Sequence, residues 1–436
     1  MAASCASCIT QFSLLLFLFI SFAYAQLPSS TSRPASIVFD LDRDPLNLQY
    51  MIKINQGTPR AAIKLSLDLG GKLPWLRCQK GYMSSSYRPV KCKSPQCSVV
   101  SKPVSCVSCN ETKLKTTGCH NNACRVYTSN PVTQSISSGE LISDIVTVKS
   151  EDVYTIDDGY IISPDMEFSK PGPIVTPRRF TFGCATASNG LRGLAKGAAG
   201  VAGIGRSSGL SLVSQFSAAF GLSRIFALEL YRSSGTIYFG GGSYVTLNYM
   251  MGVIYKRYLT YTPLLINPRR REEYFIDVRS VLIHGKTVPI SKKLLSINKK
   301  TGVGGTKIDI RIPYTMLETS IYRAFVKVHT EWAKGMNVSR VASVEPFSAC
   351  YSSSTIPWTT IGNPEPPTVE LNFPKNVYWN IVKDLVWIND GVHCLAFVDG
   401  GSNPVTSIVI GAHQMGFIEF DISRSRVGFE GPRWIT

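Results

Sequence analysis

The chain has 436 residues and a formal net charge of +17, with 46 Lys and Arg against 29 Asp and Glu. The basic residues are dispersed in short clusters, and no long basic tract with interleaved aromatics is present, which excludes a nucleic-acid-binding tail. The excess charge predicts attraction to polyanions or acidic proteins, with a solvated basic surface as the alternative explanation.

The chain begins with a predicted secretory signal peptide over residues 1–25. Residues 12–22 are uncharged and apolar and run into Ala23-Tyr24-Ala25, an A-x-A cleavage pattern. The apolar stretch is shorter than the roughly 20 residues that cross a bilayer, which disfavours the alternative of a membrane anchor. We therefore expect a secreted, extracellular protein with no membrane segment after cleavage.

Short segments of strand composition dominate the rest of the chain. They are rich in Val, Ile, Tyr, Phe and Thr and are separated by Gly, Pro, Ser and Asn. The predicted strands are residues 61–69 (AAIKLSLDL), 140–148 (ELISDIVTV), 235–241 (GTIYFGG), 273–283 (EYFIDVRSVLI) and 406–413 (TSIVIGAH). Helical spacing is confined to residues 211–220 (SLVSQFSAAF) and 318–333 (ETSIYRAFVKVHTEWA). Many short strands with few helices predict a mainly β protein.

Ten cysteines remain after signal-peptide removal, and seven of them fall within residues 78–124. An even number in an exported chain predicts five disulfides. Zinc binding by Cys106, Cys109, Cys119 and Cys124 is the competing interpretation. The expected compartment is oxidising, however, and no His pair accompanies these cysteines. We expect no metal and no cofactor. The ten residues are Cys78, Cys92, Cys97, Cys106, Cys109, Cys119, Cys124, Cys184, Cys350 and Cys394.

Two N-x-S/T sequences, Asn110-Glu111-Thr112 and Asn337-Val338-Ser339, predict glycosylation of Asn110 and Asn337 on the surface of an exported protein.

Two distant segments share one plan. IKLSLDLGG and GTKIDIRIP each contain an apolar strand that ends in an aspartate, Asp68 and Asp309. Each is followed much later by an apolar-Gly segment, at residues 200–206 (GVAGIGR) and 408–414 (IVIGAHQ). This repetition predicts two lobes built on one pattern.

These features resemble the pepsin-like aspartic peptidases, whose two lobes each present one Asp from an Asp-Thr/Ser-Gly turn backed by an apolar-apolar-Gly strand. The resemblance runs from residues 51–59 (MIKINQGTP) to 420–429 (FDISRSRVGF). The spacing of Cys78, Cys92 and Cys97 is similar to the plant branch with a cysteine-rich insertion. Within that branch, residues 304–325, 340–350 and 394–414 are similar to the extracellular dermal glycoprotein, the xylanase and xyloglucanase inhibitors and the basic seed globulins.

The resemblance implies a mainly β, bilobal pepsin-like acid protease fold, with two β-barrel-like lobes, a central cleft and few helices. The lobes would span residues 26–220, with the insertion at 78–124, and residues 221–436. It also implies a disulfide between Cys350 and Cys394.

The resemblance identifies Asp68 and Asp309 as the carboxylate pair, which in the peptidases shares a proton and activates a water. The hydroxyl-bearing residue that follows each Asp in the peptidases is replaced here by Leu69 and Ile310. The Gly of the second turn is Arg311, whose guanidinium would hold a carboxylate ionised and oppose proton sharing.

The hairpin that covers the substrate in the peptidases is expected to contain a Tyr-Gly-Asp-Gly-Ser sequence. Residues 131–135 of this chain read PVTQS instead, so the tyrosine is absent. These losses act on one catalytic step, and we therefore expect the carboxylate pair to be degenerate and proteolysis to be vestigial or very weak.

The first predicted function is a proteinaceous inhibitor of secreted microbial cell-wall glycoside hydrolases, acting in the plant apoplast in defence. The candidate contacts are Arg311 and Tyr314, with the loops 362–367 and 400–405; a structural ion pair of Arg311 is the alternative. The other functions considered are a weakly active aspartic endopeptidase that uses Asp68 and Asp309, and a basic wall-associated binding or storage glycoprotein, with wall polyanions as a further partner.

Overall fold

The computed structural model describes residues 33–78, 82–100, 103–109, 118–155, 167–177, 179–186, 190–242, 244–246, 253–254, 259–357, 368–381 and 383–430. From Ala35 onward the described residues belong to one compact unit. The predicted signal peptide, Asn110 and the loop 362–367 lie outside the described residues. Among the helices of the described part, none has the length and apolar character needed to cross a membrane.

The two halves of the chain repeat one arrangement of strands. In the first half β3 pairs in parallel with β11, which also pairs antiparallel with β4, while β10 joins β4 in parallel. In the second half β20, β29, β21 and β28 make the same three pairings. The duplication confirms the bilobal, mainly β architecture predicted above. The strands are β3 (Ala61–Asp68), β4 (Trp75–Arg77), β10 (Phe180–Ala185), β11 (Gly200–Gly203), β20 (Thr306–Ile308), β21 (Thr315–Leu317), β28 (Phe397–Asp399) and β29 (Ile408–Ile410).

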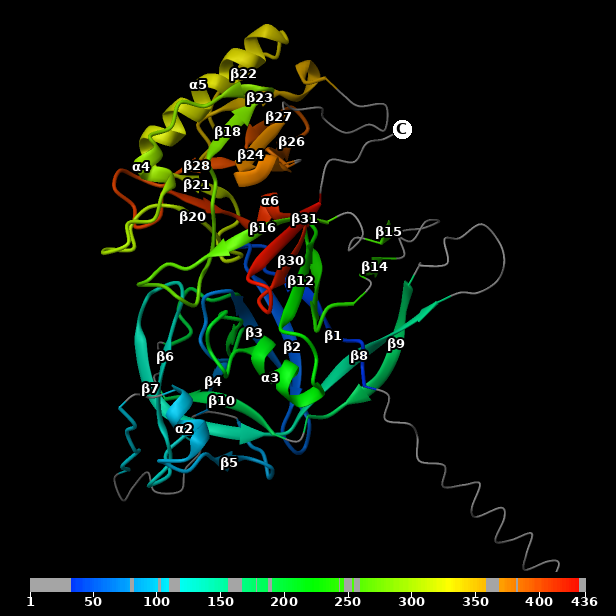
Figure 1. Ribbon diagram of the computed structural model, residues 1–436, viewed down its shortest axis with the longest axis vertical. Coiled ribbons are helices and arrows are strands. Elements are labelled where there is room, and N and C mark those ends of the chain that lie inside the picture. The colour runs from blue at the N-terminus through cyan, green and yellow to red at the C-terminus, as the bar shows by residue number, and fades with distance from the viewer. Residues whose placement is uncertain are drawn as a thin grey trace, which may run out of the picture. The chain divides into compact units, whose positions relative to one another are not determined.

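A six-stranded antiparallel sheet, with the order β1-β13-β12-β30-β31-β16, joins the two halves. In Figure 1 β12, β30 and β31 lie between the blue-to-green first half and the yellow-to-orange second half. The lobe boundary near residue 220 stays a prediction. The strands are β1 (Ser36–Arg43), β12 (Ile225–Leu230), β13 (Ser234–Phe239), β16 (Leu259–Leu265), β30 (Phe417–Asp421) and β31 (Arg426–Glu430).

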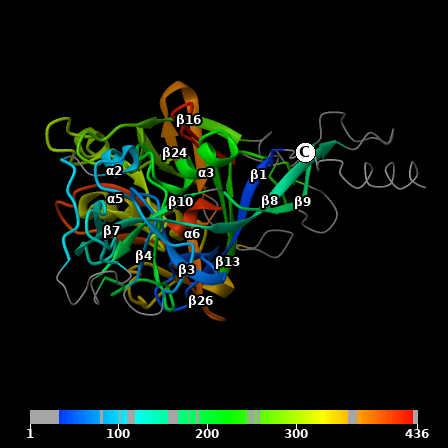
Figure 2. The same cartoon turned by 90° about the horizontal axis from the view of Figure 1, so that it is seen from below.

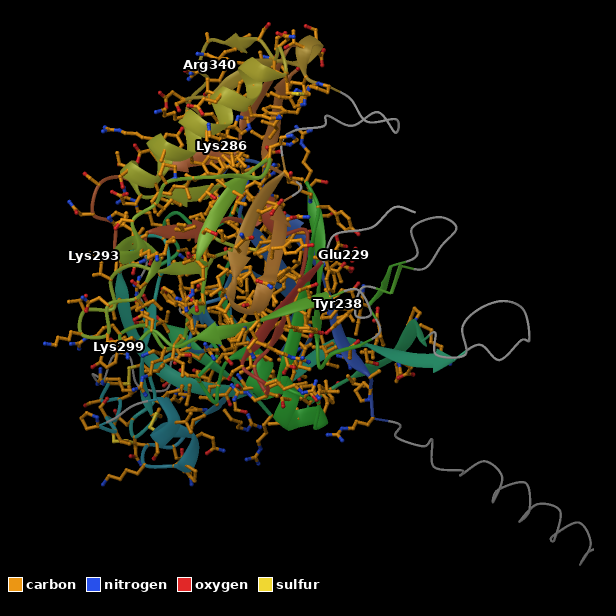
Figure 3. The ribbon with its side chains drawn as sticks, turned by 45° about the horizontal axis from the view of Figure 1, so that its top comes forward. Glu229, Tyr238, Lys286, Lys293, Lys299 and Arg340 are labelled. Carbon is orange, nitrogen blue, oxygen red and sulfur yellow. A yellow bond between two sulfur atoms is a disulfide. The ribbon has the colours of Figure 1, made fainter. Side chains whose placement is uncertain are left out.

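Three acidic residues of this shared sheet are buried, Glu229, Glu419 and Asp421, and the first of them, Glu229, shows how such a group is accommodated. It is 3% exposed and accepts hydrogen bonds from the hydroxyls of Tyr231 and Tyr238 (Figure 3). Two hydroxyl donors allow the carboxyl group to remain inside the sheet without an unsatisfied oxygen.

The first lobe is completed by further strands and two helices. The hairpin of β8 and β9 extends away from the sheet as an arm (Figures 1 and 2). The elements are β2 (Tyr50–Gln56), β5 (Arg88–Pro89), β6 (Arg125–Ser129), β7 (Ile136–Asp144), β8 (Val146–Thr155), β9 (Glu167–Val175), α2 (Pro95–Val100) and α3 (Leu212–Phe220), followed by β14 (Val245–Thr246) and β15 (Val253–Ile254).

The second lobe carries the longest helix of the described part, α5, on its outer side (Figure 1). The elements are β17 (Tyr274–Ile276), β18 (Ser280–Ile283), β19 (Lys286–Thr287), β22 (Arg340–Val341), β23 (Cys350–Ser352), β24 (Val369–Phe373), β25 (Val377–Ile381), β26 (Leu385–Asn389), β27 (Val392–Leu395), α4 (Lys292–Leu295), α5 (Thr319–Gly335), α6 (Ala412–Met415) and the 3-10 turns η3 (Ser353–Thr355) and η4 (Pro374–Asn376).

Both predicted helices are confirmed, as α3 and α5. Helix α3 ends at Gly221, whose φ of 63° is the left-handed conformation that glycine adopts readily. Helix α5 begins after Glu318, whose carboxylate accepts hydrogen bonds from the backbone N–H groups of Ser320 and Ile321. Its apolar residues recur on one face and include Ile321 and Phe325, which are buried in the core.

Three of the predicted strands were too long. Residues 140–148 form the end of β7 and the start of β8, because β7 pairs with β10 whereas β8 pairs with β1 and β2. Residues 273–283 divide in the same way into β17 and β18, which pair with different partners. Residues 406–413 form β29 and then the first turn of α6. A strand that changes sheets keeps its apolar composition, so composition alone misses the break.

All ten cysteines expected in the mature chain form disulfides. Four bridges lie in the first lobe: Cys78–Cys184, Cys92–Cys106, Cys97–Cys124 and Cys109–Cys119. The fifth, Cys350–Cys394, joins β23 to β27 in the second lobe. The zinc interpretation is therefore wrong for this structure, because the four cysteines it used are bonded in three disulfides and offer no thiolate.

Candidate functional site

The two predicted carboxylates occupy equivalent positions in the duplicated pattern. Asp68 is the last residue of β3 and lies opposite Gly203 of β11; Asp309 directly follows β20. Each accepts a hydrogen bond on Oδ1 from the backbone N–H two residues later, that of Gly70 at 3.0 Å and that of Arg311 at 3.1 Å. The side chains are 10% and 6% exposed. The turn that presents a carboxylate is therefore retained in both lobes.

The space behind these turns requires small residues. A Cβ atom on Gly203 would lie 2.6 Å from the carbonyl oxygen of Leu73, and one on Gly411 would lie 2.5 Å from the carbonyl carbon of Tyr314. The glycine of each apolar-Gly strand thus allows a neighbouring chain segment to pass close behind the aspartate. This is the physical reason for the repeated pattern in the sequence.

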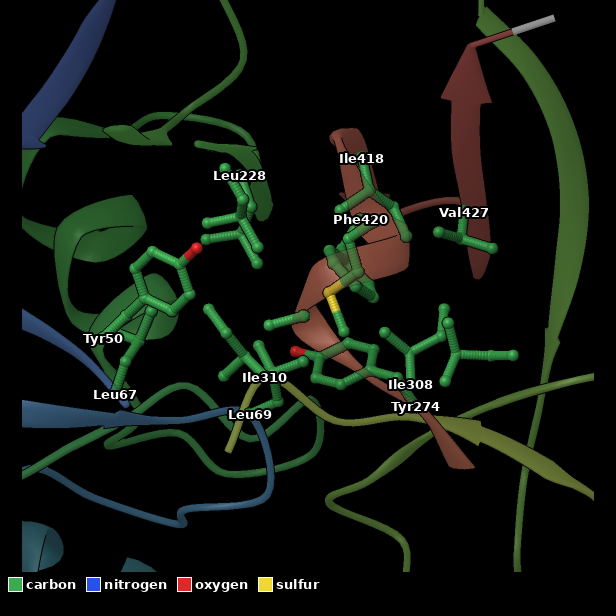
Figure 4. Packing of buried hydrophobic residues seen from close by; sticks show 14 of the residues in the cluster. Tyr50, Leu67, Leu69, Leu228, Tyr274, Ile308, Ile310, Ile418, Phe420 and Val427 are labelled. Carbon is green, nitrogen blue, oxygen red and sulfur yellow. The ribbon is translucent and has the colours of Figure 1, made fainter. Parts of the chain in front are cut away.

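Leu69 and Ile310, the residues that follow the aspartates, are buried in the core. They are 2% and 1% exposed and belong to the main hydrophobic cluster. Figure 4 draws both in one packed group with Leu67 and Tyr274. Aliphatic packing therefore replaces the hydroxyl hydrogen bonds that hold the two turns together in the peptidases. It stabilises the core, but dispersion contacts do not orient the carboxylates as directional hydrogen bonds do.

The guanidinium of Arg311 binds the carboxylate of Asp309 through two hydrogen bonds. Nε donates to Oδ1 at 2.8 Å and Nη2 donates to Oδ2 at 2.5 Å, which is bidentate geometry. Nε also lies 3.5 Å from Oδ1 of Asp68. The structural ion pair considered in the sequence analysis is therefore present, and one cation contacts both carboxylates.

The same guanidinium also reaches the covering hairpin. Its Nη1 donates to the carbonyl oxygen of Pro131 at 2.8 Å, in the turn between β6 and β7. Asn130 fixes this turn, because its Oδ1 accepts from the N–H groups of Val132 and Thr133. Its Nδ2 donates to the carbonyls of Gly190 and Arg192. Arg311 thus occupies the space between the hairpin and the carboxylates, where a peptidase would hold water and substrate.

Two further charged residues, Lys307 and Glu273, extend the cluster. Nζ of Lys307 lies 3.2 Å from Oδ2 of Asp309 and 3.3 Å from Oε1 of Glu273. Sequence reasoning missed both. Lys307 carried a signal, because residues two apart in a strand point to the same face as Asp309 does. Glu273 carried none, since only the pairing of β17 with β20 brings it close.

The electrostatics of the two carboxylates differ. Burial alone would raise the pKa of Asp309, but the charge and hydrogen bonds of Arg311 outweigh it, together with Lys307, and lower that pKa to about 2. Burial raises the pKa of Asp68, and the charge of Asp309 adds to that rise against the opposing effect of Arg311. Burial lowers the pKa of Arg311, but its aspartate partners raise it further, so the guanidinium stays charged. Asp309 is therefore held ionised by the bidentate Arg311 and not by a proton shared with Asp68.

The remaining predicted residues are dispersed. Tyr314 is half-buried, with its ring centroid 4.7 Å from that of Phe347 and 5.8 Å from that of His413. Asn337 is exposed directly after α5. In the loop 400–405, Gly400 and Pro404 are half-buried and the other residues are exposed, with Val405 59% exposed. The structure thus brings Asp68, Asp309 and Arg311 into one site and places the other candidates elsewhere.

Comparison with known proteins gives a consistent set of relatives. A family model described as xylanase inhibitor N-terminal matches residues 50–241, and one described as xylanase inhibitor C-terminal matches residues 273–431. The chain is 40% identical to the "Probable aspartic proteinase GIP2" of Nicotiana benthamiana, over 98% of this chain and 95% of that protein.

Solved structures agree with this result. The chain is similar to the crystal structure of edgp, with a TM-score of 0.82, 41% identity and coverage of 92% of this chain and 95% of that one. It is also similar to conglutin gamma, a basic 7S globulin from lupine seeds, with a TM-score of 0.74, 32% identity and the same coverage.

Proposed function

The chain belongs to the xylanase-inhibitor family of pepsin-like proteins, and on that premise we propose that it is a secreted, non-proteolytic inhibitor of microbial cell-wall glycoside hydrolases. The observation that carries the absence of proteolysis is Arg311, which binds Asp309, contacts Asp68 and donates to Pro131 of the covering hairpin. A peptide cannot approach the carboxylates while the guanidinium is there.

The expected reduction in catalytic rate also argues against proteolysis, because several residues that assist the carboxylates are lost from one site. Removing one positioned electrostatic or proton-transfer group typically lowers a rate by about 10² to 10⁴. Here Leu69 and Ile310 replace the orienting hydroxyls, Arg311 replaces a small residue, and the hairpin has no tyrosine. Since water activation by the pair needs all of these, the retained aspartates alone do not support an efficient peptidase.

For hydrolase binding we propose a surface on the second lobe that we call the three-loop face. Its three loops are residues 266–271, 299–304 and 400–405. Hydrogen bonds join them: the Gly304 N–H donates to the Val405 carbonyl at 3.0 Å, and Nη2 of Arg270 donates to the carbonyls of Gly302 and Val405. Exposed apolar side chains lie beside exposed basic ones. The face consists of Ile266, Val303, Val405, Arg269, Arg271 and Lys299.

This composition fits an acidic protein partner. Ile266, Val303 and Val405 are 67%, 44% and 59% exposed, an apolar centre of the kind that partner binding buries. The basic residues around them make no ion pair within the described part of the chain, so they are available to steer a negatively charged partner. Glycoside hydrolases carry a pair of catalytic carboxylates, against which an inserted cation makes charge-assisted hydrogen bonds.

The hydrolase contacts the loop 400–405 and the rest of the three-loop face, while Arg311 stays in its ion pair with Asp309. Inserting Arg311 into a hydrolase would leave Asp309 buried without its partner, which is strongly unfavourable. Tyr314 packs on Phe347 and His413 and lines a separate pocket.

The test is inhibition of a panel of secreted microbial xylanases and endoglucanases by the purified protein. We expect inhibition that weakens with salt and is reduced tenfold or more in Arg269→Glu/Lys299→Glu. The matched control is Lys327→Glu/Lys334→Glu, which reverses two exposed charges on α5 and should inhibit normally. Absence of inhibition across the panel would reject the inhibitor function and favour a wall-associated binding or storage glycoprotein.

A second candidate, a weak aspartic endopeptidase, is favoured by the retention of both Asp68 and Asp309 and by the relative named as a probable aspartic proteinase. Incubation with a denatured protein at acidic pH, with and without pepstatin, tests it directly. Pepstatin-sensitive cleavage that disappears in Asp309→Ala would establish the peptidase and reject the inactive site; no cleavage is expected.

A further inference from the structure

A pocket of about 680 Å³ is lined in part by Tyr314, the last residue of the loop 311–314. It is formed by the end of β1, the β12–β13 turn, β26 and α6. The loop is tied to α6 by hydrogen bonds from the N–H groups of Ala412 and His413 to the carbonyls of Ile312 and Pro313. We call this pocket the aromatic–basic pocket. Its defining side chains are Arg43, Arg232, Lys383, Tyr231, Tyr314 and Trp387.

Three cations line this pocket, and none of them is in an ion pair among the described residues, although the charge of Glu430 acts on Lys383. Nη1 of Arg43 donates to the carbonyl of Arg232 at 2.7 Å, and Nζ of Lys383 donates to the carbonyl of Leu230 at 3.3 Å. Arg232 lies with Cζ 4.9 Å from the ring centroid of Trp387. Carbonyls and a ring thus hold the cations in place without neutralising their charge.

The single lining carboxylate, Asp44, offsets only part of the charge of the three cations and forms no ion pair with them. Its Oδ atoms accept hydrogen bonds from the backbone N–H groups of Leu46, at 2.8 Å, and of Lys196. The hydrogen bond from Lys196 is the largest of the effects that lower the pKa of Asp44. The pKa of His413 is lowered to about 4, first by burial and then by the nearby Lys383, Arg43 and Arg232, against the opposing effect of its hydrogen bond to the carbonyl of Leu385. The histidine is therefore neutral, and the pocket has a net positive potential.

The aromatic side chains give the pocket flat apolar walls. Trp387 and Tyr231 are 42% and 41% exposed, which is unusual for rings of this size in a protein interior or on an ordinary surface. Tyr314 is held at a fixed angle by its contacts with Phe347 and His413. A half-exposed ring beside a fixed cation favours a ligand that has both a ring face and an anionic group.

We propose that the aromatic–basic pocket binds an acidic oligosaccharide, with sugar rings against Trp387 and Tyr314 and carboxylates on Arg43, Arg232 and Lys383. Separate cations on three chain segments match carboxylates repeated along a chain of rings, and the volume is within the range of small-ligand sites. Arg in particular binds planar carboxylates through two parallel hydrogen bonds. The pocket shares no residue with the three-loop face, so the inference is independent of the proposed hydrolase inhibition.

The experiment is titration calorimetry of the full-length mature protein with trigalacturonate, maltotriose, citrate and 4-hydroxycinnamate. Maltotriose has three rings without charge, citrate has three carboxylates without a sugar ring, and hydroxycinnamate is an aromatic carboxylate. We expect trigalacturonate to bind at least tenfold more tightly than each of the others. Equal binding of citrate would reduce the site to a non-specific cation cluster, and preference for hydroxycinnamate would replace the sugar by an aromatic acid; either result overturns the proposal.

Two variants locate the binding. Trp387→Ala removes a wall and Arg232→Gln removes a charge; both side chains are exposed, so both proteins should fold, as thermal melting will check. Each should weaken trigalacturonate binding tenfold or more. The matched control, Lys293→Gln, removes one exposed charge on α4 at the edge of the second lobe (Figure 3) and should change affinity less than twofold. Equal loss in the control, or no loss in either pocket variant, would overturn the assignment.

Discussion

The Arg311 guanidinium and the Asp309 carboxylate, two residues apart on one turn, form a bidentate ion pair in a site where the side chains are 19% and 6% exposed. The pair lies at the centre of a cluster of five charges, because Asp68 contacts Arg311, Lys307 contacts Asp309, and Glu273 contacts Lys307. Both carboxylates are thereby part of one charged network. Its energetic consequences can be measured.

Breaking the central pair should be costly. Arg311→Ala leaves Asp309 buried beside Asp68, and we expect it to lower the free energy of unfolding by roughly 3–5 kcal/mol at pH 7. Asp309→Ala/Arg311→Ala should lose less than the sum of the single variants, since it removes both charges. Chemical denaturation measures all three. The control is Arg424→Ala, whose side chain is 71% exposed beside Asp421 and which should change stability by less than about 1 kcal/mol. Additive single losses would contradict a coupled pair.

The stability of the protein should fall in strong acid partly because of Asp309. Its pKa in the folded state, about 2, is below the ordinary value of 3.8, so the stabilisation is complete above about pH 4 and is lost as pH falls toward 2. The expected loss is roughly 2 kcal/mol. Asp68 acts in the opposite direction, because its pKa is raised and its ionised form is disfavoured by folding.

Denaturation curves between pH 2 and pH 7 check these signs. The acid-induced loss should be smaller in Asp309→Asn than in the unmodified protein, whereas Asp68→Asn should leave stability at pH 7 unchanged or higher. Asp42→Asn, which changes a carboxylate 59% exposed to solvent, serves as the control. An identical pH profile for Asp309→Asn and the unmodified protein would refute the lowered pKa.

The aliphatic residues behind the turns should resist conversion to the peptidase pattern. Leu69→Thr or Ile310→Thr replaces a fully packed side chain by a smaller one with a buried hydroxyl, and each should cost about 2–4 kcal/mol. The double variant should recover part of the loss if the hydroxyls bond to each other across the lobes. Thermal and denaturant unfolding provide the measurement. No proteolysis is expected from the double variant, because Arg311 remains; cleavage of a denatured protein by it would show that the guanidinium does not block the site.

Lys307 should matter far more than an exposed lysine in a similar pair. Lys307→Met removes a cation, 12% exposed, that neutralises both Asp309 and Glu273, and we expect a loss of about 1–3 kcal/mol. Lys64→Met removes the 43%-exposed partner of Asp42 and should cost less than about 1 kcal/mol. Equal effects of the two substitutions would show that burial does not strengthen the network.

Local patterns predicted much of the fold. The helices at 211–220 and 318–333 were predictable because an apolar face at helical spacing stays informative whatever it packs against. The strands at 61–69 and 235–241 were found because their strand composition is bounded by turn residues. The breaks at Ile145 and after Ile276 were not found, since they depend on where β8 and β18 find new partners. Sheet pairing is a long-range property, and strand composition carries no record of it.

The residues of the carboxylate site also fall into those that local sequence predicted and those that it missed. Asp68, Asp309 and Arg311 were identified from two short segments, because each lobe's turn is a local structure. Glu273 was missed, since β17 brings it to the site from a segment with no matching pattern. The aromatic–basic pocket was also invisible in the sequence, as Arg43, Arg232, Lys383 and Trp387 come from three distant parts of the chain.

By itself, the sequence determined the family, the two carboxylates and the loss of the residues that would orient them, because those properties depend on residue identity at matched positions. Only the tertiary structure decided what Arg311 does. A guanidinium two residues after a buried aspartate can project outward toward a partner or fold back onto the carboxylate. It folds back here because Asp309, Asp68 and the Pro131 carbonyl converge on one point, and three acceptors in a site shielded from water hold a cation more strongly than solvent does.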